Sequence, residues 1–129
     1  MRDYQRKKNN PWVLPRAVYQ RALWLARDYD RMRQAAEDTI TVSREPGQHI
    51  APNGGHSDPV FAAVKRREAY IRSIEIIDNA LAQIPKEYRR GVWESVQSGR
   101  RYPDDAHRNT YSRWKSCFLY LVADAAGYI

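Results

Sequence analysis

The chain has 129 residues, of which 43% are hydrophobic and 29% charged. That is enough apolar material for one small domain and excludes wholesale disorder. Lys and Arg number 22 against 15 Asp and Glu, and the formal charge of +7 favours a polyanionic partner without indicating sequence specificity.

The same sequence indicates a compartment. No run approaches the roughly 20 apolar residues that cross a bilayer, and no apolar signal-peptide stretch follows the N-terminus. Cys117 is the only cysteine, which excludes an intrachain disulfide. We therefore expect a cytoplasmic protein with no membrane partner, in which Cys117 is a buried and inert thiol.

The N-terminal part predicts an arm, one helix and a loop. Residues 1–14 are polar and basic and contain Pro11, which favours an extended arm. Apolar residues then recur at steps of three and four and predict a helix from Pro15 to about Asp38: Val18, Ala22, Leu25, Tyr29, Met32 and Ala36. Residues 39–57 break this pattern with a strand-like alternation at 39–42 and a loop rich in Gly and Pro. Residues 1–57 are thus expected to form one part and residues 58–129 another.

The C-terminal part predicts three further helices. Asp58-Pro59 starts a long helix that runs to about Gln83, and its near-heptad spacing permits pairing with the first helix or with another subunit. Pro85 separates it from a helix over residues 86–98, which Gly99 stops. Asp104 and Asp105 are candidate caps for a closing helix over residues 109–126. We expect an all-α protein with four helices, no sheet, an extended arm and a helix-turn-helix-like C-terminal module.

The closing helix is the principal candidate site. Its apolar residues lie on one face, and its polar edge opens with side chains that can hydrogen-bond base edges and phosphates. The predicted DNA-binding residues, with the basic connection before the helix, are Arg100, Arg101, Arg108, Asn109, Thr110, Ser112, Arg113, Lys115 and Ser116. The competing interpretation is the solvated face of an ordinary helical bundle.

Two other basic groups allow two interpretations each. Arg89 and Arg90 form either a second phosphate patch or a solvated pair. The run Arg6-Lys7-Lys8 is either a DNA-binding arm or a soluble tail.

Catalytic and metal chemistry have little support. The three histidines share no metal-ligand spacing, Cys117 has no cysteine partner, and the acidic residues are scattered. The glycine-rich segment at 52–56 lacks the ending of a phosphate-binding P-loop. We expect no enzyme activity, no cofactor and no metal.

Short motifs resemble a known family. The segment Ala80-Leu81-Ala82-Gln83-Ile84-Pro85-Lys86-Glu87-Tyr88-Arg89 resembles the entry to a sigma-region-4-like module. The ending, from Tyr102-Pro103-Asp104-Asp105 through Arg113-Trp114-Lys115 to Gly127-Tyr128-Ile129, is similar to small phage proteins, the RinA/ArpU-type late transcriptional regulators. The resemblance covers residues 50–129 and implies a DNA-binding activator of phage late genes. It places a recognition helix at Asn109, Thr110, Ser112, Arg113 and Lys115.

These observations predict a phage or prophage transcriptional regulator that binds double-stranded DNA through its C-terminal module. RNA polymerase is an expected further partner, and the long helix would serve a homodimer. The alternative is a helical protein-interaction or structural phage component that does not bind DNA.

Overall fold

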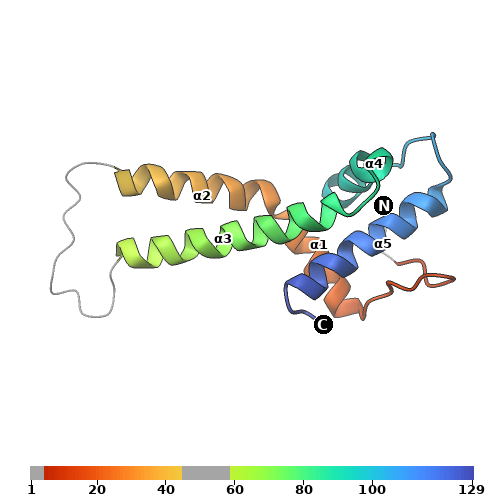
Figure 1. Cartoon of the computed structure of the whole chain (residues 1–129), viewed down its shortest axis with the longest axis horizontal. Coiled ribbons are helices and arrows are strands. Elements are labelled where there is room, and N and C mark those ends of the chain that lie inside the picture. Colours follow the sequence, from red (N-terminus) through yellow and green to blue (C-terminus); the bar gives the residue numbers. More distant parts are fainter. Residues whose placement is uncertain (1–4, 45–58) are drawn as a thin grey trace. The chain divides into compact units, whose positions relative to one another are not determined.

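A computed structural model of the chain describes residues 5–44 and 59–129, with side chains from 5 to 39 and from 59 onward (Figure 1). Within these residues the fold is all-α, as predicted, with five helices and no strand. The helices are α1 (Arg16–Arg27), α2 (Tyr29–Arg44), α3 (Pro59–Ala82), α4 (Lys86–Ser98) and α5 (Arg108–Ala125). The predicted loop at 50–55 and the predicted Asp58 cap lie outside the described residues.

The chain divides into two compact units. Unit 1 comprises residues 1–28 and 76–129, and unit 2 comprises residues 29–75. This division differs from the expected boundary between residues 57 and 58, because α3 contributes its first part to unit 2 and its last residues to unit 1.

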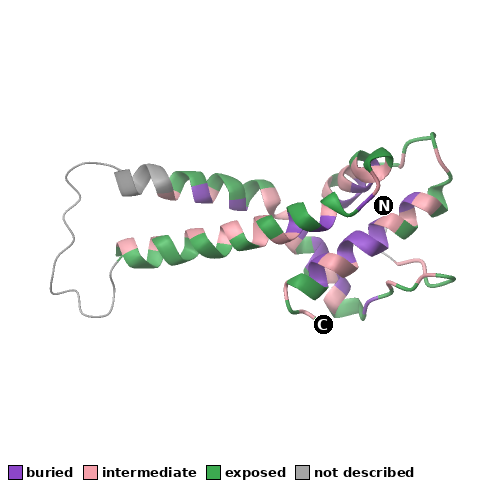
Figure 2. Ribbon diagram, viewed as in Figure 1, coloured by how far each residue is buried: buried purple, intermediate pink, exposed green. Residues whose placement is uncertain are grey.

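Unit 1 is a helical bundle in which α1 and α4 both pack against α5, and α1 also contacts α4. Its apolar core collects buried residues from α1, α4 and α5, from the last residues of α3, and from the segments next to these helices (Figure 2). The core residues are Leu14, Tyr19, Ala22, Leu23, Ala26, Ile77, Ala80, Ile84, Val92, Val96, Tyr111, Cys117, Phe118, Leu119, Val122 and Ala123. Two side chains also join α4 to α1: Arg27 Nε donates to the Val96 carbonyl at 2.8 Å, and Gln97 Nε2 donates to the Ala26 carbonyl at 2.7 Å.

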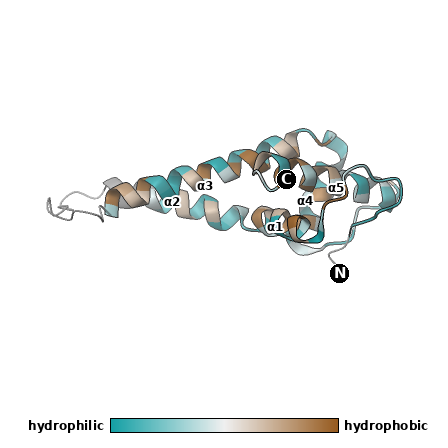
Figure 3. Cartoon of the chain, turned by 90° about the horizontal axis from the view of Figure 1, so that it is seen from below, coloured by the Kyte–Doolittle hydropathy of each residue, from teal (hydrophilic) through white to brown (hydrophobic). Residues whose placement is uncertain are grey.

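Unit 2 consists of α2 and most of α3, and the Arg31 guanidinium of α2 lies 5.4 Å from the centre of the Tyr70 ring of α3. Met32 and Ala36 are buried on α2. Hydrophilic and hydrophobic residues alternate along both helices (Figure 3). Phe61 and Val64 are exposed by 58% and 39%.

The prediction of one helix from Pro15 to Asp38 is wrong, because the chain turns at Asp28. The Asp28 amide donates to the carbonyls of both Trp24 and Leu25 at 3.1 Å, which ends α1. No Gly or Pro marks this position. The apolar spacing continues through the break because α2 has its own apolar side.

The prediction that residues 39–42 form a strand-like segment is also wrong, because α2 continues to Arg44. Thr39 Oγ1 donates to the Ala35 carbonyl at 2.9 Å, one helical turn earlier. An alternation of only four residues therefore did not override the helix that precedes it.

Candidate nucleic-acid interface

Particular residues end α4 and begin α5. Gly99 ends α4 in the left-handed conformation, with φ of 67°, as its predicted stop position requires. Residues 99–107 then connect α4 to α5. The cap of α5 is His107, whose Nδ1 accepts the Asn109 amide at 3.1 Å, and not Asp104 or Asp105 as predicted.

Aspartates 104 and 105 make other contacts. Asp105 accepts a hydrogen bond of 2.5 Å from the Tyr111 hydroxyl, which ties the connection to α5. Asp104 lies 4.0 Å from the exposed guanidinium of Arg101. Asp105 thus ties the connection to α5, whereas the Arg101–Asp104 pair is exposed and adds little stability; neither carboxylate caps the first turn of α5.

An aromatic cluster holds the connection and the helices together. The Tyr111 ring is 5.2 Å from Tyr102 in a stacked geometry and 5.3 Å from Tyr88 in an edge-to-face geometry. Trp114 stacks on Tyr88 at 6.4 Å and on Trp12 at 6.2 Å. These rings are packed against one another. They therefore hold the connection to the helices and do not form an open platform on which bases could stack.

Gly91 permits this packing. A Cβ at this position would lie 2.5 Å from Tyr111 Cε1 and 2.9 Å from Pro103 Cδ, closer than real contacts allow. The absence of a side chain therefore lets α5 and the connection approach α4.

Most of the predicted DNA-binding residues lie at the surface. Arg100, Arg101, Arg108, Asn109 and Arg113 are exposed, and Thr110 and Ser112 are half-buried. They come together at the N-terminal half of α5 and the connection before it. This end of the polar edge is therefore open to solvent.

Two predicted residues are buried, which corrects the sequence-based assignment. Lys115 is only 6% exposed, and its Nζ lies 3.4 Å from Ser95 Oγ of α4. Ser116 is 5% exposed and accepts a hydrogen bond from Asn10 Nδ2 at 3.0 Å. The polar edge therefore becomes part of the fold one turn after Arg113. Composition alone could not show this, because the partners come from distant parts of the chain.

The segment expected to be an extended arm is a closed loop. The Gln5 side chain makes two hydrogen bonds to the backbone of Leu14, donating to its carbonyl at 2.8 Å and accepting its amide at 2.7 Å. Asn10 donates to the Arg6 carbonyl at 2.6 Å and accepts the Trp12 amide at 2.9 Å. Asn9 adopts a positive φ of 54°, as Asn tolerates in tight turns. We call residues 5–14 the N-terminal loop.

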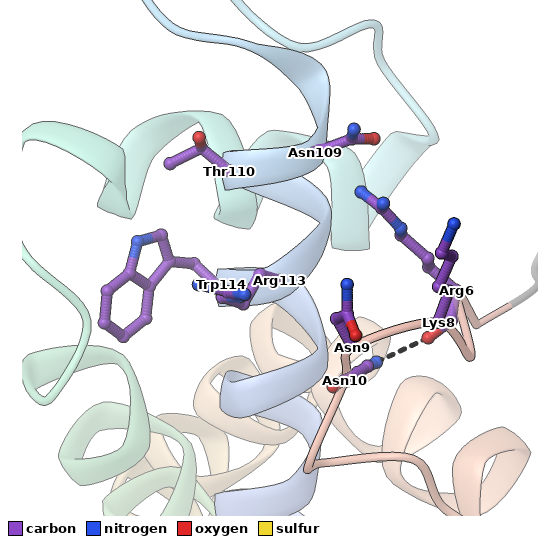
Figure 4. A pocket seen from close by; sticks show the side chains of 8 residues that line it. All are labelled: Arg6, Lys8, Asn9, Asn10, Asn109, Thr110, Arg113 and Trp114. Atoms are coloured by element: carbon purple, nitrogen blue, oxygen red, sulfur yellow. Dashed lines mark hydrogen bonds between the residues drawn. The ribbon is translucent and has the colours of Figure 1, made fainter.

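Two hollows in unit 1 border the start of α5. The loop-side hollow has a volume of about 290 Å³ and is lined by Arg6, Lys8, Asn9, Asn10, Asn109, Thr110, Arg113 and Trp114 (Figure 4). The connection-side hollow has a volume of about 790 Å³. It is lined by Arg6, Gly99, Arg101, Tyr102, Pro103, Asp104, Ala106, Arg108, Asn109, Ser112 and Lys115.

The hollows lie on opposite flanks of α5. Each residue of a helix turns the side chain by about 100°, so Thr110 and Trp114 point to one flank and Arg108 and Lys115 to the other. Asn109 lines both hollows and marks the ridge between them. The start of α5 thus forms a polar ridge at Asn109 where the two hollows meet, with Arg6 of the N-terminal loop also lining both hollows.

The charge of these surfaces is strongly positive. Their lining includes six cationic side chains: Arg6, Lys8, Arg101, Arg108, Arg113 and Lys115. Among the described lining residues, Asp104 is the one carboxylate. Such a surface attracts a polyanion, and the N-terminal end of a helix adds a partial positive charge.

Arg89 and Arg90 have different partners within the fold. Arg89 donates to the carbonyls of Ile84 and Ala82, both at 2.7 Å, and so caps the C-terminal end of α3. Arg90 pairs with Glu94 at 3.1 Å on the surface of α4.

Two titratable groups in unit 1, Tyr111 and Cys117, have raised pKa values. Burial, the hydrogen bond to Asp105, and the charges of Asp105 and Tyr88 raise the pKa of Tyr111 to about 12. Burial also raises the pKa of the Cys117 thiol, which is consistent with an unreactive core residue. Neither group therefore supplies a nucleophile or a base near neutral pH.

Among the described side chains, no group of three or more His, Cys, Asp or Glu is placed so that it could hold a metal ion. In the part of the chain that the structure describes, no helix is both long and apolar enough to cross a membrane. Comparisons of the chain with protein-family models, with curated proteins and with solved structures gave no match.

Proposed function

We propose that unit 1 binds double-stranded DNA with the N-terminal half of α5 in the major groove. The observation that carries the proposal is the polar ridge of α5 between two hollows whose lining holds six cations and one carboxylate. The major groove is about 12 Å wide and admits an α-helix, so phosphates of the two strands would flank the helix on either side. This geometry favours a duplex over a single strand.

The residues divide into two roles under this proposal. Asn109 and Arg113 are exposed at the ridge, where an amide can bond adenine and a guanidinium can bond guanine. Arg108 and Arg101, on the connection side, would contact phosphates and supply the salt-dependent part of the affinity.

The proposed mode differs from an ordinary helix-turn-helix. Such a motif joins its two helices by a turn of three or four residues, whereas α4 and α5 are separated by residues 99–107. In the proposed mode α5 enters the groove with the exposed residues of its N-terminal half. As part of the same proposal, the bound protein activates transcription of phage late genes, which is the role that the RinA/ArpU resemblance implies. RNA polymerase is a further partner in this proposal.

The test is fluorescence anisotropy with a labelled duplex, titrated at several salt concentrations. The double substitution Arg108→Ala, Arg113→Ala should lower the affinity. It should reduce the slope of log K against log salt by about one, for the phosphate contact of Arg108, and relax the preference for guanine at the base that Arg113 contacts. A matched control removes the same charge from unit 2, by replacing the exposed Arg33 and Arg72 with Ala.

Equal losses in both double variants would show only general attraction and would refute the proposed interface, as would a duplex affinity no greater than that of a single strand of equal length. If neither of these results is obtained, selection from a random oligonucleotide pool would identify the preferred DNA site. If the pool gives no enriched sequence and no duplex binds, the alternative function is favoured, namely a helical protein-interaction or structural component that does not bind DNA.

A further inference from the structure

The N-terminal loop places two cationic side chains beside the start of α5. Its cations Arg6 and Lys8 both line the loop-side hollow, and Arg6 also lines the connection-side hollow. Figure 4 shows them rising from the loop beside the start of α5, from which Asn109 and Arg113 project. Lys7, which lies between them in the sequence, is exposed but lines neither hollow.

We infer that the N-terminal loop is a preformed second half of the DNA site. In this inference, which rests on the proposed function, Lys8 binds a backbone phosphate on the loop side of α5, and Arg6, which lines both hollows, binds a backbone phosphate where the two hollows meet. The loop-side hollow contributes no carboxylate among its described lining residues, and two of these residues, Asn9 and Asn109, are exposed asparagines that can donate to phosphate oxygens. Its ligand is therefore a phosphodiester of the duplex backbone.

The conformation of the loop is built from specific contacts. The Gln5 side chain closes the loop on Leu14, whose own side chain is buried in the core of unit 1. Asn10 joins the loop to Ser116 of α5, and Trp12 stacks on Trp114. Because these contacts exist without DNA, binding would not have to order a flexible arm, and that lowers the conformational entropy lost in the complex. Gln5 and Asn10 are thus positioning residues for Arg6 and Lys8.

The sharpest test compares neighbours of equal charge. Lys8→Ala should weaken duplex binding about tenfold, the factor typical of one hydrogen bond between charged groups, and lower the salt slope by about one. Arg6→Ala should do the same. Lys7→Ala removes the same charge from the same loop and should change the affinity by less than about twofold, since an exposed charge away from the ligand is screened.

A neutral substitution then tests the positioning role. Gln5→Ala removes both hydrogen bonds to Leu14 without changing the charge. If the loop conformation places Arg6 and Lys8, this variant should lose about two units of salt slope, as the Arg6→Ala, Lys8→Ala double variant does. Circular dichroism at the assay temperature establishes that the helices remain formed.

Equal effects of Lys7→Ala and Lys8→Ala would overturn the inference, because the loop would then act only through its net charge. An unchanged salt slope in Gln5→Ala would overturn the positioning role. Both results leave the proposed function intact if Arg108→Ala, Arg113→Ala still loses affinity, whereas no loss in that variant refutes the proposed function and this inference together.

Discussion

Substituting Gly91 by alanine tests how α4, α5 and the connection are packed. An added Cβ would lie 2.5 Å from Tyr111 Cε1 and 2.9 Å from Pro103 Cδ. The Tyr111 ring cannot move aside easily, because it is 1% exposed, stacks on Tyr102 and has Tyr88 at its edge. The backbone of α4 or the connection must therefore shift.

The magnitude follows from two opposing effects. Overpacking by a methyl group in a close-packed site typically costs about 1–3 kcal/mol. Replacing a glycine inside a helix by alanine contributes a gain of about 1 kcal/mol. We therefore expect Gly91→Ala to lower the free energy of unfolding by up to about 2 kcal/mol, measured by urea denaturation followed by circular dichroism.

The sign of the change decides between two accounts of this glycine. Helix propensity alone predicts that Gly91→Ala stabilises the protein, whereas the close approach predicts destabilisation. A gain in stability would refute the packing described for Tyr111 and Pro103. The same substitution should also weaken DNA binding, because the shifted connection carries Arg101 and leads into Arg108.

Three further predictions test buried groups of unit 1. Between pH 9 and pH 11 the wild type should lose about 1.4 kcal/mol of stability relative to Tyr111→Phe, because a pKa of about 12 keeps the folded phenol protonated while the unfolded phenol, with a pKa near 10, ionises. The stability that the raised pKa contributes is thus complete below pH 10 and falls as the pH rises; parallel pH profiles of the two proteins would contradict this environment for Tyr111. Cys117 is 8% exposed with a raised pKa, so it should react with a disulfide reagent at least tenfold more slowly in the native protein than in urea, and equal rates would show that the thiol is accessible. Lys115→Ala should lower the unfolding free energy by about 1–3 kcal/mol and Arg113→Ala by less than about 0.5 kcal/mol, because only Lys115 is buried; similar values in thermal or urea denaturation would disprove its burial.

The elements that sequence reasoning located well carry their own local signals. Pro85 and Gly99 bracket α4, and their restricted or permissive backbones act on neighbouring residues alone. Such signals need no knowledge of the tertiary structure.

The features that sequence reasoning missed depend on contacts between distant segments. The break at Asp28 has no Gly or Pro, and it separates helices that belong to different compact units. The burial of Lys115 requires Ser95 of α4 beside it, and the closed N-terminal loop requires Ser116 more than a hundred residues away. Periodicity shows which side of a helix is polar, but the packing partners decide how much of that side stays exposed.

The burial of Lys115 and Ser116 changes which residues can test DNA binding. A variant that removes Lys115 would lose stability and affinity together, so its loss of binding would not distinguish a DNA contact from a folding defect. Arg108 and Arg113 are exposed, and Arg6 and Lys8 belong to a loop held by backbone and amide hydrogen bonds that these substitutions do not remove. Losses of affinity at these four positions with an unchanged unfolding free energy would therefore report on the interface itself.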